Sequence, residues 1–227
     1  MRLAKVQLAR AIWLFDTAEM NPHGSSIAEP LFTGLKRRYG FRKYPSVADI
    51  GGNSIRFEEG SFVLDEKSYD VSLQIYSDGI SADTRHSTYT SDQFLLDVAK
   101  WAVNDIGLSF TPDFAKKRAY RSELVIYAPR GLCGLSEKLD HLSSQFPFIT
   151  SGNTPEVTGF SIGMKGASPL FTFERKYGDP LEDLRFTSYA QMETDAHLAV
   201  LELMSTILFG ESILSSSEET SESSAVS

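Results

Sequence analysis

The sequence has a single cysteine, Cys133, and only four histidines among its 227 residues. One cysteine cannot form a disulfide within the chain, which is typical of a reducing compartment such as the cytoplasm. The histidines form no HxH or HExxH pair, and zinc sites need closely spaced His and Cys ligands. We therefore expect a cytoplasmic protein with no metal and no cofactor.

Long apolar runs are also missing. No stretch reaches the roughly 18 apolar residues of a membrane-spanning helix, and the longest candidate, Leu198–Phe209, contains Glu202. The first apolar run, Ala11–Phe15, is far shorter than the apolar core of a signal peptide. These absences predict a soluble chain with no membrane contact.

Positive charge is in short supply, because 22 Lys and Arg face 30 Asp and Glu. Nucleic-acid binders usually carry a basic face that neutralises phosphates, so we expect nucleic acid to be an unlikely partner. The densest basic cluster combines residues 36–38 with Arg42 and Lys43, and we expect it at the end of a helix, away from the sheet. Residues 211–227 are mostly Ser and Glu without an aromatic residue, which predicts a disordered acidic tail.

The first half of the chain shows the patterns of an α+β protein. Apolar residues recur every four positions from Ile27 to Tyr39, between a Ser26–Glu29 capping box and Gly40, which predicts a helix. Alternating residues predict four strands in an antiparallel meander, joined at Asp78–Gly79 by a two-residue hairpin loop. The expected elements are a strand over 6–15, a helix over 27–39, strands over 55–57, 62–64, 71–76 and 80–85, and a helix capped by Thr90 or Ser91 that ends at Gly107.

The second half repeats this order with one strand fewer. We expect a strand over 119–128, a helix over 135–146, strands over 157–164, 170–176 and 184–192, and a helix over 195–209. The chain is thus interpreted as two pseudo-repeats of β-α-β(3–4)-α, residues 1–108 and 109–210, that form one compact body. Antiparallel meander sheets would be covered on one side by helices. Similar segments support the duplication: 91–95 resembles 194–198, and 76–79 resembles 177–180.

This order of elements resembles the TATA-binding-protein-like fold, a duplicated β-α-β4-α unit whose sheets form a curved saddle. The resemblance covers most of residues 5–210 and lies in topology alone, without a shared motif. It implies a saddle-shaped open sheet face. A saddle that reads DNA needs Phe wedges and a basic underside. Here the faces expected to be exposed carry a mixed set of side chains, namely Ser72, Gln74, Asp83, Arg121 and Glu123.

The best candidate site is the polar run that leaves the fourth strand and enters the following helix. It brings together a carboxylate, a guanidinium, an imidazole and a hydroxyl, from Asp83, Arg85, His86 and Ser87. Loops held by rigid elements often carry binding residues. The competing interpretation is structural, with Arg85 paired to Asp83 and the hydroxyls of the run capping the helix.

No recognisable catalytic motif is present. Residues 131–134 lack the Lys-Ser/Thr ending of a phosphate loop, and the E-x-K triplet at 174–176 lacks a nearby acidic partner, since Asp113 is distant in sequence. The leading hypothesis is therefore a non-enzymatic binding or assembly subunit that acts through an open sheet face or edge, with a protein partner or a second copy of itself. The alternatives are an enzyme of unrecognised type, such as a hydrolase or nuclease component, and a nucleic-acid-binding saddle.

Overall fold

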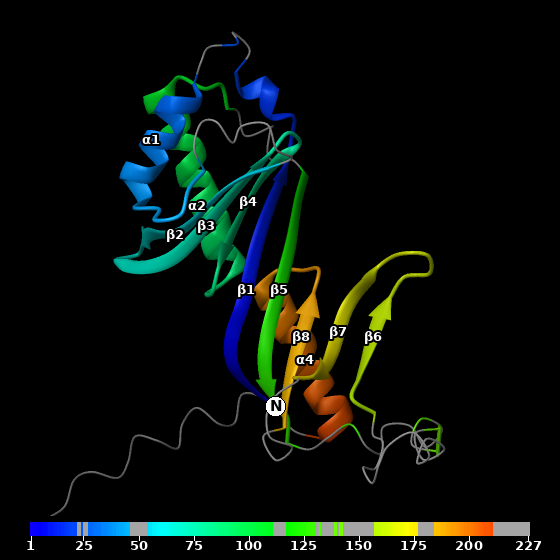
Figure 1. Cartoon of the computed structure of the whole chain (residues 1–227). Coiled ribbons are helices and arrows are strands. Elements are labelled where there is room, and N and C mark those ends of the chain that lie inside the picture. The colour runs from blue at the N-terminus through cyan, green and yellow to red at the C-terminus, as the bar shows by residue number, and fades with distance from the viewer. Residues whose placement is uncertain are drawn as a thin grey trace, which may run out of the picture. The chain divides into compact units, whose positions relative to one another are not determined.

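A computed structural model describes residues 1–45 except 22, 23, 25 and 26, residues 54–110, 117–129, 157–176 and 184–210, and positions 132, 139, 141 and 142. The fold is α+β (Figure 1). Its described elements are β1 (Arg2–Leu14), η1 (Thr17–Met20), α1 (Ala28–Tyr39), β2 (Ser54–Leu64), β3 (Lys67–Tyr76), β4 (Gly79–Thr84), α2 (Thr88–Trp101), the π-helix η3 (Ala102–Ile106), β5 (Lys117–Tyr127), β6 (Gly159–Gly163), β7 (Pro169–Arg175), β8 (Arg185–Ala190) and α4 (Thr194–Phe209).

Eight strands form one antiparallel sheet in the order β2-β3-β4-β1-β5-β8-β7-β6. The chain divides into two compact units. The first unit contains Val6–Ser122 and Gln191–Asp195, and the second contains Met1–Lys5, Glu123–Ala190 and the helix from Ala196 onward. This division differs from the one expected at residues 108 and 109, because β1 and β5 each contribute residues to both units. None of the described helices is long and apolar enough to span a membrane.

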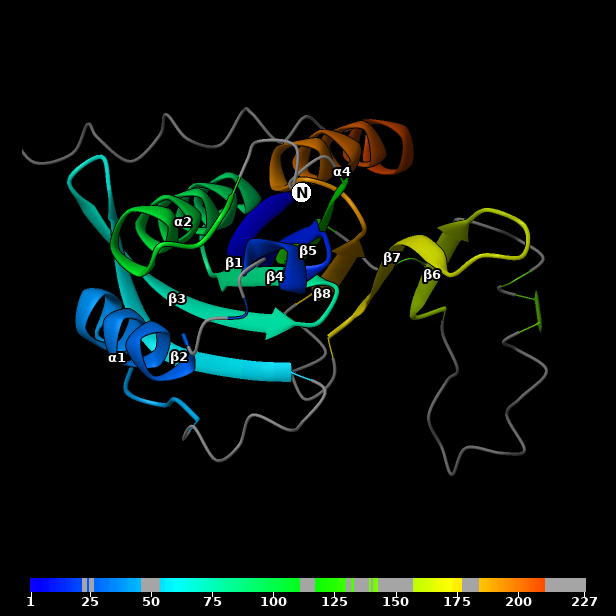
Figure 2. The same ribbon diagram turned by 90° about the horizontal axis from the view of Figure 1, so that it is seen from above.

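The first unit buries one face of its strands against α1 and α2. Successive side chains of a strand point to opposite faces, so Ala11 and Trp13 of β1 share a face with Val71 and Leu73 of β3. These residues join the aromatic and aliphatic side chains of both helices in one core. Figure 2 shows this unit from above, with α1 and α2 beside the strands. As expected from the alternation in β4, Ile80, Ala82 and Thr84 are buried on that face.

The meander has three strands after α1, and the expectation of four was wrong. Residues 54–64 form a single strand, β2, with an irregularity in its pairing to β3 between Phe57 and Gly60. The turn between β2 and β3 is Asp65–Glu66, and both residues have positive φ, 49° and 64°. Two consecutive positive φ values are the mark of a type I′ turn, which usually contains Asn or Gly. The segment Asp65–Glu66 contains neither Gly nor Asn, so the turn could not be predicted from its residues.

The hairpin between β3 and β4 is present, with its loop one residue earlier than expected. Tyr76 pairs with Gly79, so the loop is Ser77–Asp78 and Gly79 begins the strand. A Cβ atom on Gly79 would lie 2.1 Å from the carbonyl oxygen of Trp13. The glycine is therefore needed for the close approach of β4 to β1.

Helix α2 begins earlier than predicted. The side chain of Ser87, in an extended conformation, accepts a hydrogen bond from the N–H of Thr90 at 3.1 Å, which makes Ser87 the N-cap in place of Thr90 or Ser91. The hydroxyl of Ser91 is buried and donates to the carbonyl of Ala9 at 2.8 Å. Helix α1 ends at Gly40, with φ 64°, as predicted. Ser26 of the expected capping box lies outside the described residues.

In the second unit, the strand pairs β6–β7 and β7–β8 are antiparallel. Phe173 and Phe186 stack with their ring centroids 4.6 Å apart. Helix α4 begins at Thr194, and its residues His197, Leu201 and Met204 are buried. The helix expected over 135–146, except for positions 139, 141 and 142, the turn at 178–180 and the tail over 211–227 lie outside the described residues.

Candidate functional site

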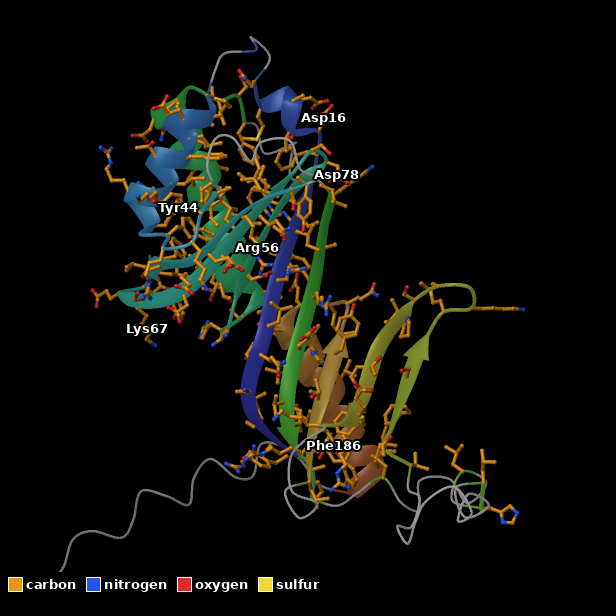
Figure 3. The ribbon with its side chains drawn as sticks, viewed as in Figure 1. Asp16, Tyr44, Arg56, Lys67, Asp78 and Phe186 are labelled. Carbon is orange, nitrogen blue, oxygen red and sulfur yellow. The ribbon has the colours of Figure 1, made fainter. Side chains whose placement is uncertain are left out.

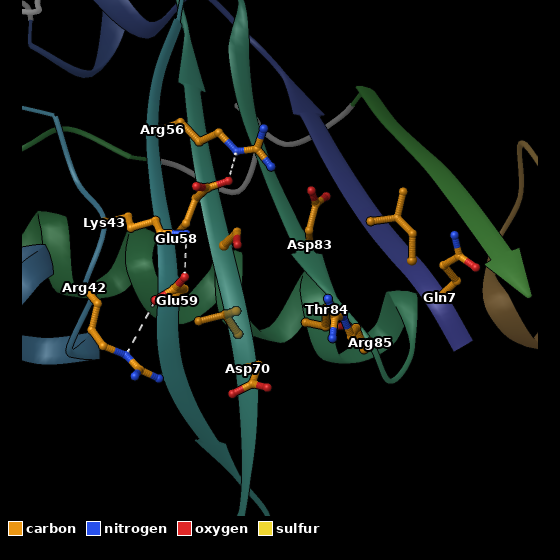
Figure 4. A pocket seen from close by; sticks show the side chains of 13 residues that line it. Gln7, Arg42, Lys43, Arg56, Glu58, Glu59, Asp70, Asp83, Thr84 and Arg85 are labelled. Atoms are coloured by element: carbon orange, nitrogen blue, oxygen red, sulfur yellow. Dashed lines mark ion pairs between the residues drawn. The ribbon is translucent and has the colours of Figure 1, made fainter. Parts of the chain in front are cut away.

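A charged cleft of about 410 Å³ lies on the first unit. We call it the open-face cleft, because its strand residues point to the face opposite the core (Figure 4). On β3, Asp70 and Ser72 alternate with the buried Val71 and Leu73, and on β4 Asp83 alternates with the buried Ala82. The pleat of the strands therefore separates the polar cleft from the apolar core.

Two carboxylates of β2 form ion pairs along one wall of the cleft. Glu58 pairs with Arg56 at 2.8 Å, and Glu59 pairs with Lys43 at 2.6 Å and with Arg42 at 3.8 Å. The hydrogen bond between Lys43 and Glu59 lowers the pKa of Glu59 and raises the pKa of Lys43. Both groups are thus held in their charged forms. Figure 3 labels Arg56 among the side chains of the first unit.

The backbone explains why Arg42 and Lys43 reach this face. Lys43 and Glu58 exchange two backbone hydrogen bonds, of 3.2 and 2.7 Å, which fasten the segment after α1 to the outer edge of β2. Glu59 has φ 57° within the irregular part of β2. The expectation that these two cations end a helix away from the sheet was wrong, because the bridge to β2 carries them to the cleft.

Asp83 forms an ion pair with a residue of the neighbouring strand β1. Its two carboxylate oxygens accept hydrogen bonds from Nε and an Nη of Arg10 at 2.6 and 2.7 Å. These residues are directly opposite each other in the β1–β4 register. The pair is half-buried, with side-chain exposures of 23% and 19%. Asp83 is therefore paired with Arg10, and the expected pair between Asp83 and Arg85 is not among the ion pairs of the described residues.

Arg85 and Asp70 are two of the exposed charges of the cleft. Within the described part of the chain, neither forms an ion pair or a side-chain hydrogen bond. The neighbouring charged residues already form ion pairs, since Asp83 is bonded to Arg10 and Glu59 to Lys43. One cation and one anion are consequently available to a ligand.

Two of the four predicted site residues belong elsewhere. The ring of His86 lies 4.6 Å from that of Tyr69, and its Nδ1 is 2.8 Å from the hydroxyl of Thr90. Ser87 caps α2. Neither residue lines the open-face cleft, so the predicted group of Asp83, Arg85, His86 and Ser87 is divided between the cleft and the start of α2.

The cleft is suited to binding charged groups. Among the described residues that line it are four cations and four carboxylates: Arg42, Lys43, Arg56 and Arg85, and Glu58, Glu59, Asp70 and Asp83. The pKa of Glu59 is lowered and that of Lys43 is raised, and both shifts favour the charged forms that bind ions. Among the residues that the structure describes, no group of three His, Cys, Asp or Glu side chains could hold a metal ion.

Sequence reasoning missed most of the cleft. The signal was present in the alternation of β2 and β3, where Arg56 and Glu58, and Asp70 and Ser72, occupy every second position. Their convergence depends on strand register, which brings Ser72 opposite Asp83. The contribution of Arg42 and Lys43 depends on an isolated bridge that has no sequence motif.

Comparison with known proteins adds no identity. No family model matches the chain, and no curated protein matches it. The function is therefore argued from the chemistry of the site.

The motif candidates without a recognised catalytic pattern either do not line the open-face cleft or lie outside the described residues. Glu174 lies on β7 of the second unit, while Asp113, residues 133–134 and residues 130–131 lie outside the described residues.

Proposed function

We propose that this protein is a non-enzymatic binding or assembly subunit whose open-face cleft takes a protein partner. The observation that carries the proposal is that Arg85 and Asp70 are exposed and have no ion pair in the described chain, whereas the other described charges of the cleft already form ion pairs. A partner that offers a carboxylate to Arg85 and an ammonium or guanidinium to Asp70 gains two interactions without breaking an existing one. Charge complementarity of this kind fixes orientation and partner choice.

The charge balance of the cleft favours a protein over nucleic acid. A nucleic-acid surface neutralises phosphates with an excess of Lys and Arg, whereas here four carboxylates stand among four cations. Arg42, Lys43 and Arg56 are already bonded to Glu58 and Glu59. A polyanion would have to compete with these internal carboxylates.

A photo-cross-linking experiment tests the proposal. A benzophenone amino acid replaces Ser72, inside the cleft, and in a matched protein it replaces Lys100, exposed on α2. We expect one discrete adduct with a partner chain or a second copy from position 72 and none from position 100. The adduct should be lost when Arg85→Glu and Asp70→Lys are combined in the position-72 protein. Equal adducts from both positions, or an adduct that survives the charge reversal, would contradict the proposal.

Fluorescence anisotropy distinguishes the nucleic-acid alternative. Labelled duplex and single-stranded DNA are titrated with the full chain at physiological salt. We expect no binding at micromolar protein. Micromolar binding that weakens steeply with salt and is lost in Arg85→Glu would favour a nucleic-acid surface over a protein partner.

The proposed assembly role includes a duplicated architecture, in which β2, β3, β4 and α2 of the first half correspond to β6, β7, β8 and α4 of the second. Two observations support it. Val71 pairs with Thr84 as Phe171 pairs with Ala190. Thr88 and Thr194, at the starts of α2 and α4, exchange hydrogen bonds: each backbone N–H donates to the other hydroxyl, at 3.0 and 2.9 Å.

This exchange is what equivalent positions in related repeats produce. Thr84 and Ala190 are separated by the same 106 residues as Thr88 and Thr194. The duplicated unit would have one strand fewer than that of the TATA-binding-protein-like fold.

A further inference from the structure

A second hollow lies in the first unit, on the covered side of the sheet. This apolar cavity has a volume of about 200 Å³. Strands β3 and β4 supply Leu73 and Ile80, α1 supplies Leu35, and α2 supplies Val98 and Ala99. It is separate from the open-face cleft, and the following inference does not depend on the proposed function.

The cavity offers nothing to hold water. Among the described residues that line it, all are apolar except Thr17, and the hydroxyl of Thr17 already donates to the carbonyl of Ser77 at 3.0 Å. A buried water needs about two to four polar partners. An apolar occupant that needs no hydrogen bond therefore fits the described lining.

The lining combines fully buried core residues with residues that keep some exposure at the edge of the core. Leu35 and Leu73 are 0% and 1% exposed, whereas Ile27, Leu31 and Ile75 are only partly buried against the same cluster. Protein interiors are normally packed as densely as organic crystals. Side chains that face an unfilled volume lose contacts which an apolar occupant would restore.

The backbone beside the cavity is also irregular. Helix α2 continues after Trp101 as the π-helical segment Ala102–Ile106, which ends at Gly107 with φ 78°. Both Ala102 and Leu108 line the cavity. This wider turn lies at the C-terminal end of the helix, where π-turns occur. Here the wider turn forms part of the wall.

From these observations we propose that the first unit binds a small uncharged apolar molecule between the covered face of its sheet and helices α1 and α2. An apolar cavity of roughly 150 Å³ in another protein accepts benzene. At about 200 Å³, this cavity suits a single aromatic ring or a short branched alkyl group. Its chemistry disfavours any ligand whose polar group would be buried there without a partner.

Binding is tested with the full chain and toluene as the probe, measured by the rise in melting temperature and by chemical-shift changes of methyl groups. We expect saturable binding, with shifts confined to residues such as Leu31, Leu73 and Val98. Phenol, which adds a hydroxyl to the ring, should bind at least tenfold more weakly. Absence of saturable toluene binding would overturn the proposal, because it would show that side chains of the chain itself fill the volume in solution.

Substitutions that fill the cavity test whether toluene binds there. Ala99→Leu fills the cavity and should weaken toluene binding at least tenfold, and Ala102→Leu should do so from another wall. Ala11→Leu is the matched control, because Ala11 is buried in the same core and does not line the cavity. If Ala99→Leu fails to fold, Ala102→Leu decides. Unchanged affinity in a folded filled variant, or equal loss in the folded control, would place the probe elsewhere and overturn the proposal.

Discussion

The two faces of the strands in the first unit are built from alternate residues of the same segments, yet one face is apolar and the other is charged. The covered face carries Trp13, Phe57 and Leu73, each at most 1% exposed. The open face carries charged residues such as Arg56 and Asp70. Each face has a hollow, apolar on one side and charged on the other. Fold stability should therefore depend on one face and recognition on the other.

The second unit buries a titratable polar pair under its helix. On α4, Nε2 of His197 lies 2.7 Å from the hydroxyl of Ser188 on β8, and the imidazole meets the ring of Phe171 edge-on. His197 is 0% exposed. Burial lowers its pKa to about 4. A covered face can thus include a titratable group, provided that the group stays neutral and bonded.

The largest effect is expected from the covered face. Trp101 is 7% exposed, as its position on the apolar side of the predicted helix indicated. Trp101→Ala should lower the free energy of unfolding by about 3–5 kcal/mol, because a buried ring is replaced by a void. Urea denaturation measures the loss. Tyr89→Ala on the same helix is the control, since Tyr89 is 59% exposed; equal losses would contradict the assignment of the two faces.

Acid should destabilise the second unit through His197. Its folded pKa of about 4 lies below the ordinary value of 6.5, so only the unfolded chain gains the proton between these values. The stability contributed by neutral His197 is present above pH 6.5 and falls as the pH decreases toward 4, by about 3 kcal/mol in total. Denaturant midpoints across this range measure the slope. In His197→Gln this component of the slope should disappear, and an unchanged slope would count against it.

Gly34 should be intolerant although it lies within a helix. A Cβ atom there would be 2.3 Å from the ring of Trp101, so Gly34→Ala should cost about 1–3 kcal/mol by overpacking. In a Trp101→Ala background the clash is gone, and the same change should stabilise α1 by up to about 1 kcal/mol because alanine favours helix. A double-mutant cycle in urea compares the two backgrounds. The same cost in both would show that the ring is not the cause.

Loss of the α2 cap should have a moderate effect. Ser87→Ala removes the acceptor for the N–H of Thr90 and should lower the free energy of unfolding by about 1 kcal/mol. Ser87→Asp, which keeps an acceptor at the N-cap, should retain most of the stability. Thermal unfolding followed by circular dichroism measures both. An equal loss in the two variants would indicate that the contact is not a cap.

The smallest effect is expected from the open face. Arg85→Glu and Asp70→Lys remove exposed charges without a partner in the described chain, and each should change the free energy of unfolding by less than about 0.5 kcal/mol. Denaturant midpoints of these variants are compared with that of Asp83→Ala, which breaks the half-buried pair with Arg10 and should lose more. A large loss from Arg85→Glu would remove the distinction between the two faces.

Local patterns in the sequence predicted most helices and strands. The four-residue spacing ending at Gly40 located α1, and the alternation from Val71 to Ile75 located β3, because both signals lie within a few residues of chain. The same reasoning misplaced the cap at Ser87 and divided β2 at residues 58–61. The position of the cap depends on where the first turn of α2 begins. The continuity of β2 depends on its pairing with β3, which carries an irregularity between Phe57 and Gly60.

By itself the sequence determined the α+β class and which residues alternate between water and core, because periodicity fixes the face on which each side chain stands. The open-face cleft was decided by tertiary structure. Register brings Ser72 opposite Asp83, and the bridge from Lys43 to Glu58 adds two cations to the wall. The apolar cavity was decided in the same way, because a void is a property of how helices and strands meet and no single segment encodes it.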